Sequence, residues 1–146
     1  MHLDFDETFP IAPAEAYRFC ETPQNWPGLF GAFTKVTDRG DGWYAVWIRH
    51  TPLPLIAKIT VAIPHEQVAW DFRGFWRGDG ALRFAETPVG TRITGHETIT
   101  IPGPRLIAKP LERTLESGFA AVWGSGWRLL RKGAATPRPP TDSRLP

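Results

Sequence analysis

The first residues alternate between apolar and polar side chains. Leu3, Phe5 and Phe9 share one face of an extended segment, and acidic residues such as Asp4 occupy the other. This period of two is typical of a strand with one buried face. Glu7 departs from the pattern, because it places a carboxylate on the apolar face. The sequence therefore predicts a strand over residues 2–9 with one acidic interruption.

Prolines indicate two short helices after this strand. Pro13 suits the first turn of a helix that continues to about Glu21, and Pro23 and Pro27 bracket a further turn or two. From residue 32 to residue 101 the pattern changes to strands separated by turn signals. These signals lie at residues 38–42, 51–54, 64–66, 77–80 and 87–90. Six strands without intervening helices must be joined by hairpins, so we expect an antiparallel meander.

The last regular element is an amphipathic helix over residues 104–131. Its apolar side chains recur at steps of three and four residues, as at Ile107, Leu111, Leu115, Phe119, Val122 and Leu130. At about 1.5 Å per residue the helix is roughly 40 Å long, enough to cross a whole sheet. Pro110 is expected to kink or restart it, because the proline ring excludes the carbonyl four residues earlier.

Three glycines fall inside this helix, at Gly118, Gly124 and Gly126. Each costs up to about 1 kcal/mol relative to alanine. One explanation is a close approach to the sheet or space for a ligand. The other is a helix that ends or bends near Gly124. The sequence leaves both open.

Composition and charge bound the class of protein. The 146 residues are 42% hydrophobic and 22% charged, which predicts one globular core over residues 1–132. Residues 133–146 are rich in proline and are expected to form a tail. Lysine and arginine number 17 against 15 acidic residues, so nucleic acid is not an expected partner.

Other features bear on location and partners. Cys20 is the single cysteine, which excludes an intrachain disulfide and favours a reducing, cytoplasmic location. No segment approaches the ~20 apolar residues that span a bilayer, so stable membrane insertion is not expected. Trp43 and Trp47 share a strand face opposite Tyr44, and a tail or a second subunit could cover it. We therefore expect a monomer or a weak homodimer, with no metal and no cofactor.

Several local segments carry a family resemblance. They are residues 9–17 (FPIAPAEAY), 25–27 (NWP), 68–70 (VAW) and 89–93 (VGTRI). With the order of predicted elements, they make residues 3–130 resemble the START-like SRPBCC superfamily, which includes polyketide cyclase/dehydrase and lipid-transport proteins. The resemblance implies an α+β helix-grip fold, in which a seven-stranded curved antiparallel sheet wraps around the long C-terminal helix. Two short helices would lie between strands one and two. Strand one would neighbour strands two and seven, and the helix would close a cavity.

Alternation along the strands and the helix then predicts which side chains line that cavity. Apolar and aromatic residues dominate, as in most small-molecule pockets, although a solid core is the alternative for any one aromatic. The predicted ligand-binding residues are Glu7, Tyr44, Val46, Ile48, His50, Ile59, Val61, Trp70, Phe72, Trp76, Leu82, Phe84, Ile93, Glu97, Leu115, Phe119, Val122 and Trp123.

Glu7 and Glu97 are the sharpest polar signals, because each interrupts an apolar strand face. If the first and last strands pair, both carboxylates could face the cavity, raise one another's pKa and orient a polar ligand group or act as acid and base. A bulge at Gly95 that turns Glu97 outward, or a salt bridge to an arginine, is the alternative. His50 ends a strand on the inward face and could reach the cavity mouth.

These patterns favour a protein that binds or carries a hydrophobic small molecule such as a lipid, isoprenoid, quinone or polyketide-like compound. The first alternative is an enzyme of the polyketide cyclase, aromatase or dehydratase type that uses a cavity glutamate or histidine. The second is a protein-interaction module with a vestigial pocket. Polar residues are sparse on the inward face, which favours the carrier, and no residue is assigned a catalytic role.

Overall fold

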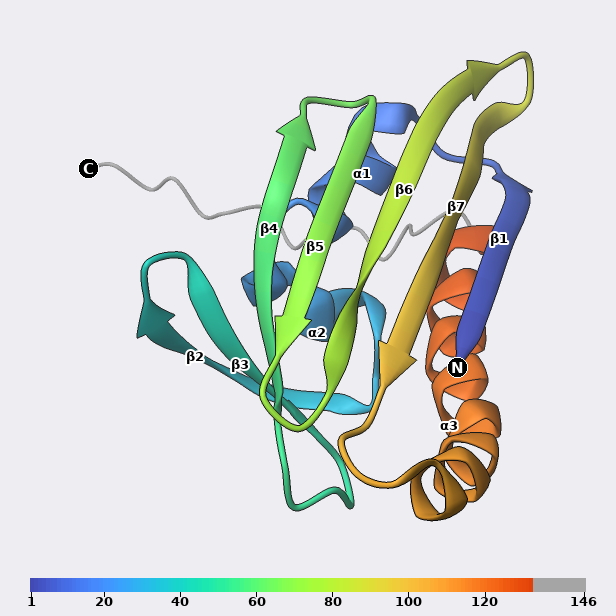
Figure 1. Ribbon diagram of the computed structural model, residues 1–146. Coiled ribbons are helices and arrows are strands. Elements are labelled where there is room, and N and C mark those ends of the chain that lie inside the picture. Colours follow the sequence, from blue (N-terminus) through green and yellow to red (C-terminus); the bar gives the residue numbers. More distant parts are fainter. Residues whose placement is uncertain (133–146) are drawn as a thin grey trace.

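The computed structural model describes residues 1–132, so the tail predicted at 133–146 lies outside the described residues. Seven strands, two α-helices of appreciable length and two short helical turns make up this part of the chain (Figure 1). The elements are β1 (His2–Phe9), α1 (Pro13–Cys20), the 3₁₀ turn η1 (Pro23–Asn25), α2 (Trp26–Leu29), β2 (Phe33–Gly40), β3 (Trp43–Ile48), β4 (Leu55–Ile63), β5 (Gln67–Arg73), β6 (Arg77–Thr87), β7 (Gly90–Thr100) and α3 (Arg105–Arg131).

The strands form a single antiparallel sheet in the order β1-β7-β6-β5-β4-β3-β2. The α+β helix-grip prediction is therefore confirmed, with the short helices between β1 and β2 and the long helix last. One detail was wrong: β1 pairs with β7 only and makes no ladder with β2. The sheet is open because its six-strand meander curves without closing, and β1 and β2 form its two edges.

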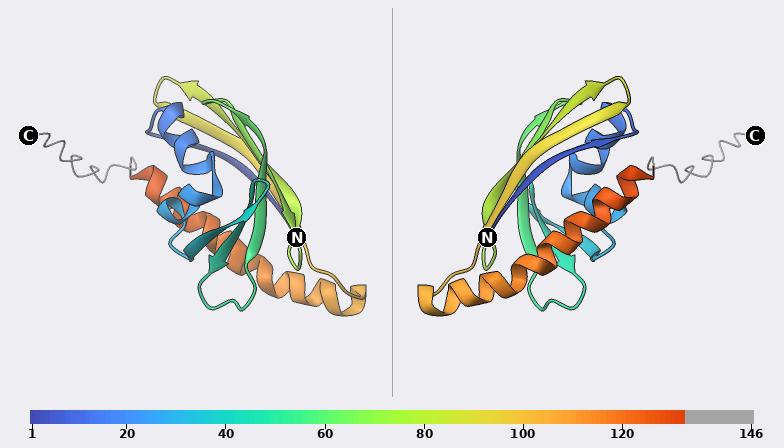
Figure 2. Two further views of the ribbon diagram at one scale, coloured as in Figure 1. Left: turned by 90° about the vertical axis from the view of Figure 1, so that its left-hand side faces the viewer. Right: turned by 90° about the vertical axis from the view of Figure 1, so that its right-hand side faces the viewer.

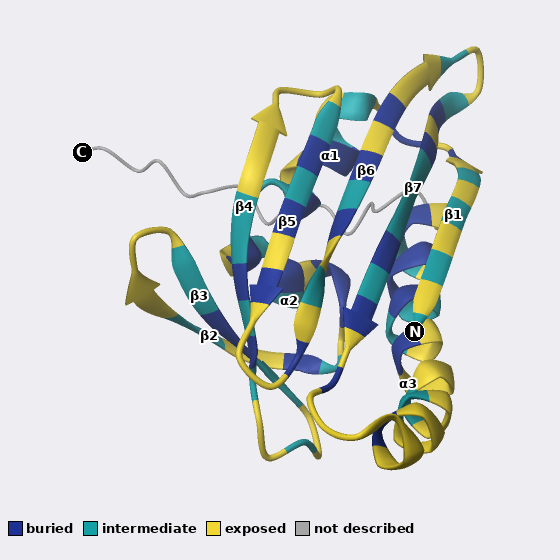
Figure 3. Ribbon diagram, viewed as in Figure 1, coloured by how far each residue is buried: buried dark blue, intermediate teal, exposed yellow. Residues whose placement is uncertain are grey.

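The sheet is strongly curved, and all the helices lie on its concave side (Figure 2). α3 crosses this side diagonally, while α1 and α2 cover the region beside it. Many side chains that point into the concave face are buried, including Val46, Leu82 and Ile93 at 0–1% exposure. Figure 3 shows the resulting alternation of buried positions with intermediate or exposed ones along β5, β6 and β7. Burying one such side chain stabilises the fold by roughly 1.5–3 kcal/mol.

The strand-to-helix junction after β1 is tied to β7. The Thr91 hydroxyl is fully buried and donates a hydrogen bond of 2.6 Å to the carbonyl oxygen of Ile11. Two of the segments that carry the family resemblance, residues 9–17 and 89–93, therefore meet in space. Their shared role here is to hold α1 against the sheet.

α3 is one continuous helix from Arg105 to Arg131, so it does not restart at Pro110. A Cβ added at Gly126 would lie 2.7 Å from the ring of Phe30, so this glycine allows α3 to pack closely against the end of α2. The explanation that the helix ends near Gly124 was wrong. Gly118 has no atom within 4 Å of such a Cβ and faces open space.

The turn predicted at residues 77–80 was also wrong, because these residues open strand β6 and the chain turns at 74–76 instead. The two glycines that suggested a turn are required inside the sheet. A Cβ at Gly78 would lie 1.8 Å from the carbonyl oxygen of Thr98, and one at Gly80 would lie 2.4 Å from the Trp70 ring. Glycine in a strand can mark a close approach as readily as a turn.

β4 contains an irregularity that reverses the direction of its side chains. Ile59 pairs with Trp70, but the next paired residue, Val61, lies opposite Ala69. The extra residue between them is a bulge, which moves Val61 out of the inward alternation. Val61 is 37% exposed, so its predicted place in the cavity is wrong.

Candidate functional site

Two cavities lie under α3 on the concave face of the sheet. The inner one has a free volume of ≈ 20 Å³, which is room for about one water molecule. The outer one, near the last residue of β3 and the first residue of β6, has a free volume of ≈ 210 Å³. Phe119 and Val122 of α3 line both, so these two side chains form the partition between them.

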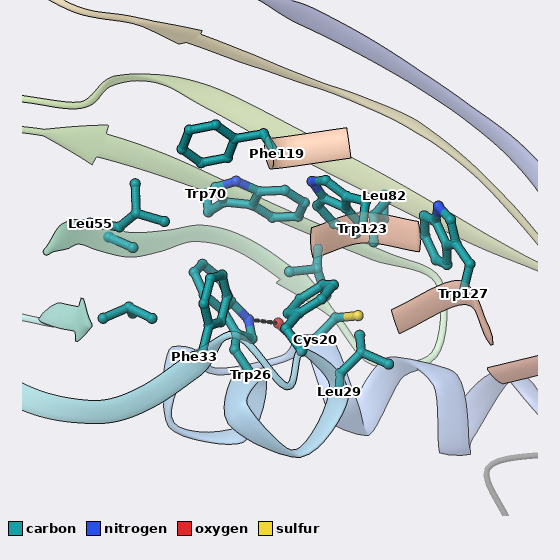
Figure 4. Packing of buried hydrophobic residues seen from close by; sticks show 14 of the residues in the cluster. Cys20, Trp26, Leu29, Phe33, Leu55, Trp70, Leu82, Phe119, Trp123 and Trp127 are labelled. Carbon is teal, nitrogen blue, oxygen red and sulfur yellow. Dashed lines mark hydrogen bonds between the residues drawn. The ribbon is translucent and has the colours of Figure 1, made fainter. Parts of the chain in front are cut away.

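The inner cavity is enclosed by the sheet, by α3 and by the segment from α1 to β2. Its lining is aromatic and aliphatic except for one thiol and one carboxyl group. The residues are Cys20, Trp26, Phe30, Phe33, Leu55, Trp70, Phe72, Leu82, Glu97, Phe119, Val122 and Trp123. Figure 4 shows the aromatic rings and Cys20 gathered between the sheet and the helices, with the Trp26 indole donating to the Cys20 carbonyl oxygen at 3.3 Å.

Three residues on adjacent strands form the floor of this cavity. Trp70 of β5 lies opposite Gly80 of β6, and Gly80 lies opposite Glu97 of β7. The close contact at Gly80 described above means that the Trp70 indole extends over β6 and occupies the space that a side chain would fill. The absent side chain thus lets an aromatic ring from one strand extend toward a carboxyl group two strands away.

Glu97 is the buried carboxyl group at the end of this row, with 6% exposure. The Trp123 indole of α3 donates a hydrogen bond of 2.9 Å to its Oε1. Burial raises the pKa of Glu97 to about 7, against the smaller lowering effect of the Trp123 and Trp70 indoles. Glu97 can therefore exchange its proton near neutral pH, as donor when protonated and as acceptor when ionised.

The Trp70 indole acts on Glu97 at longer range than Trp123 does. It is near enough to lower the pKa of the carboxyl group, yet its Nε1 is buried without a hydrogen-bond partner within residues 1–132. A buried donor without a partner is costly. An acceptor placed in the inner cavity, from a water molecule or a ligand, would satisfy it.

Aromatic rings surround the carboxyl group on the α3 side. The Trp123 ring stacks on Trp70 at a centroid distance of 6.1 Å and meets Phe30 edge-on at 4.9 Å. Trp26 contacts Trp70 at 5.9 Å from the opposite side. The inner cavity is therefore an aromatic chamber with one titratable carboxyl group.

The outer cavity has a simpler lining of mostly apolar side chains at the ends of several elements. Its residues are Ala32, Ile48, Arg49, Thr51, Trp76, Leu115, Gly118, Phe119 and Val122. Arg49 contributes the one charged group. The Trp76 ring packs edge-on against Phe119 at 5.4 Å, which places a second tryptophan beside the partition.

Glu7 does not join Glu97, so the predicted pair of carboxylates was wrong. Both face the concave side, but the residue of β1 opposite Glu97 is Leu3, and Glu7 lies opposite Ile93. Four residues along a strand separate the two positions by about 13 Å. Glu7 forms an ion pair with Arg131 at the end of α3, which is the arginine salt bridge considered as the alternative. Glu97 turns inward, because β6 and β7 pair without a bulge at Gly95.

The structure brings ten of the predicted residues to the two cavities: Ile48, Trp70, Phe72, Trp76, Leu82, Glu97, Leu115, Phe119, Val122 and Trp123. The other eight line neither cavity. Val46, Phe84 and Ile93 are packed in the core, and Tyr44, Ile59 and Glu7 are half-buried. His50 and Val61 are exposed. His50 adopts a positive φ of 64° in the loop after β3, which turns the chain so that its neighbours Arg49 and Thr51 face the cavity instead.

The residues that the prediction missed come mainly from the wall opposite the sheet. Cys20, Trp26, Phe30 and Phe33 lie between α1 and β2. These helical turns are too short to show a clear periodicity, and only the NWP segment of the family resemblance pointed to this region. Burial raises the pKa of the Cys20 thiol to about 12, so it stays protonated and serves as an apolar lining group.

Comparisons with known proteins address the fold. No protein-family model and no curated protein matches the sequence. Among solved structures, the di-domain aromatase/cyclase StfQ of the steffimycin biosynthetic pathway is 15% identical, with a TM-score of 0.65 over 90% of this chain and 49% of that chain. The chain thus spans about half of StfQ.

Two further structures match over nearly their whole length. The Aha1 dimer from Colwellia psychrerythraea is 12% identical, with a TM-score of 0.64 over 92% of this chain and 99% of that one. DR_A0006 from Deinococcus radiodurans is 15% identical, with a TM-score of 0.62 over 91% and 97%. The chain shares its helix-grip fold with these solved structures. In the described part of this helix-grip chain, no helix combines the length and apolar character needed to cross a membrane.

Proposed function

We propose that this helix-grip protein binds a hydrophobic small molecule beneath α3, with its apolar body in the outer cavity and a polar atom directed toward Glu97. The observation that carries the proposal is that the two cavities are adjacent. An outer space of ≈ 210 Å³ with one charged lining residue is separated from a buried carboxyl group by two side chains, Phe119 and Val122.

The partition can open without a change of fold. Val122 is only half-buried, and rotation of its side chain or of Phe119 would join the two spaces. A ligand that enters from the outer cavity would then reach the aromatic chamber and the unpartnered Trp70 donor. An apolar pocket with a few convergent polar groups is the usual form of a small-molecule site.

Binding is favoured over acid–base catalysis because the chamber offers a single titratable group near neutral pH. The Cys20 thiol stays protonated, and Glu7 is engaged elsewhere with Arg131. The observation that supports the second candidate, an enzyme of the polyketide cyclase type, is the pKa of about 7 at Glu97. A group with that pKa can serve as a general acid or base.

The test is a titration of intrinsic tryptophan fluorescence with fatty acids, quinones and flavonoids. Val122→Phe should fill the partition and weaken binding of any ligand that gives a saturable signal. Ala120→Phe adds the same ring to an exposed position of the same helix and should leave affinity unchanged. A wild-type protein without saturable binding, or equal affinities of the two variants, would contradict the proposal.

Glu97→Gln separates the two candidate functions. For a binder, the variant should change affinity for ligands that carry a carbonyl or hydroxyl group more than for hydrocarbons, because the side chain keeps its shape and loses its titration. For an enzyme, it should abolish turnover of a polyketide substrate while binding is retained. If the variant binds each ligand class with the same affinity as the wild type does, Glu97 does not contribute to the binding site.

A further inference from the structure

We propose that the end of the molecule that carries the mouth of the outer cavity docks on an anionic lipid surface. This inference goes beyond ligand binding, and it is measured without a ligand. It starts from large apolar side chains that remain exposed at that end, on three separate segments. They are Leu53 at 42% and Phe75 at 36%, in the β3–β4 and β5–β6 loops, and Leu106 at 91%, Ile107 at 67% and Leu111 at 41%, in the first turns of α3.

These segments lie at the same end of the sheet. Figure 2 shows the first turns of α3 extending beyond the edge of the sheet, at the same end as the β3–β4 loop. Trp76, which lines the outer cavity, connects the two loops to its wall. Its indole donates to the Leu53 carbonyl oxygen at 3.3 Å, and its ring packs against Phe75 at 4.9 Å.

One row of side chains on α3 continues from this exposed end into the cavity. Ile107, Leu111 and Leu115 are spaced four residues apart, so they lie on one side of the helix. Leu115 already lines the outer cavity, and Gly118 and Val122 continue its lining along the same side. An apolar surface thus leads without interruption from the tip of the helix to the proposed ligand site.

Basic side chains lie on the other side of the same turns, next to Leu106. Arg105, Lys109 and Arg113 recur at four-residue steps on the same turns, are exposed, and form no ion pair with residues 1–132. The nearby Glu112 is engaged, since it accepts from the Ile101 amide at 3.2 Å and lies 3.6 Å from the amino group of Met1. Glu116, one turn farther on, is exposed and also forms no ion pair with residues 1–132, so the uncompensated charge here is three basic groups against one acidic group.

This combination suits a bilayer surface better than a protein partner. Apolar side chains on separate tips can each enter the boundary between headgroups and acyl chains, and the long stems of lysine and arginine let their charges reach anionic headgroups. Docking of this kind needs no membrane-spanning helix. A hydrophobic ligand could then pass between the bilayer and the outer cavity without crossing water.

The test is co-sedimentation of the full chain with vesicles of phosphatidylcholine alone and with phosphatidylglycerol added. The wild type should bind the anionic vesicles about tenfold or more tightly than the neutral ones, and salt should weaken this binding. Ile107→Asp with Leu111→Asp, and separately Lys109→Glu with Arg113→Glu, should each reduce affinity for anionic vesicles by about tenfold or more.

Matched controls at other surfaces should bind as the wild type does. Val89→Asp places the same charge on an apolar side chain that is 72% exposed in the β6–β7 turn, at the opposite end of the sheet (Figure 1). Arg83→Glu reverses an exposed charge on β6. All the substitutions lie at exposed positions, so thermal melts should confirm that the variants fold.

Two results would overturn the proposal. One is a wild type that binds neither vesicle, or that loses binding equally in the mouth variants and the controls. The other is a wild-type dimer in analytical ultracentrifugation that Leu111→Asp converts to a monomer, since the surface would then belong to a second copy of the chain. Val122→Phe should weaken ligand binding and leave vesicle binding intact, so the failure of one proposal is distinguishable from the failure of the other.

Discussion

The two halves of α3 both carry large apolar side chains, but their surroundings are opposite. Leu130 in the last turn has 0% exposure, whereas Leu106, the second residue of the helix, has 91%. The C-terminal half lies against the sheet and supplies Phe119, Trp123 and Trp127 to the core. The N-terminal half continues past the edge of the sheet (Figures 2 and 3). Helical periodicity thus shows that a face is apolar but not what covers it.

The largest expected difference between the halves is in unfolding free energy. Leu130→Ala should lower it by about 4 kcal/mol, because it removes a fully buried side chain and leaves a cavity. Leu106→Ala makes the same chemical change where nothing packs, and should alter stability by less than about 0.5 kcal/mol. Urea denaturation of the two variants gives the comparison directly. Similar losses in both would mean that the N-terminal half is also covered.

A second difference concerns pH, because Trp123 of the buried half holds the carboxyl group of Glu97. In the unfolded chain Glu97 ionises near its ordinary pKa of 4.5, whereas in the folded protein its pKa is about 7. The folded state therefore holds a proton that the unfolded state has lost, so this group lowers stability progressively from about pH 4.5 to pH 7. The total effect is roughly 3 kcal/mol.

Glu97→Gln should remove that part of the pH dependence, since glutamine does not titrate. The check is a series of urea denaturations of both proteins between acid and slightly alkaline pH, read as the difference between them. The difference should grow in favour of the variant as pH rises through this window and then level off. A constant difference would show that the Glu97 pKa is not raised by folding.

Replacing two of the glycines in α3 by alanine should change the stability of the protein in opposite directions. Gly126→Ala should destabilise the protein by about 1 kcal/mol, since the new methyl group would press on Phe30 and Leu29 in a packed region. Gly118→Ala should stabilise it by up to about 1 kcal/mol, because helix propensity improves and the position is open. Thermal melts can resolve both changes. Stabilisation by both substitutions would mean that α3 can move away from α2 at little cost.

The smallest effect is expected for charges on the helix surface. Arg131→Gln removes the ion pair with Glu7 and should cost less than about 1 kcal/mol, as is usual for exposed pairs. Arg113→Gln removes a charge that has no partner within residues 1–132 and should change stability by even less. Added salt should reduce any difference between the two variants. A larger loss for Arg113 would indicate a stabilising contact on the N-terminal half.

The sequence was sufficient to predict the fold, because alternation in the strands and periodicity in the last helix are local patterns that the tertiary structure preserves. Glu97 could be found for the same reason, as a carboxylate on an apolar strand face. A pairing of Glu97 with Glu7 could not be excluded from the sequence, because the register between β1 and β7 depends on contacts between segments that are far apart in the chain. The prediction that Val61 points inward was wrong because β4 contains a bulge after Ile59, and no glycine or proline in the sequence marks that bulge.

The wall of the chamber opposite the sheet was the least predictable part. Trp26 and Phe30 enter the site from short helical turns, where too few residues exist to define a face. Gly78 and Gly80 of β6 predict a turn from the sequence, although they lie inside a strand. Glycine permits both tight turns and close approach, and only the position of the Trp70 ring distinguishes the two.

The glycine beneath Trp70 makes the size of the inner chamber adjustable from a position that no bound molecule would touch. A methyl group at Gly80 would meet the indole at 2.4 Å and lift it toward Trp123, so that the ring itself would occupy the small space beside Glu97. Residue 80 is therefore the position to substitute when this pocket is to be redesigned for a smaller ligand. The visible lining residues could then stay as they are.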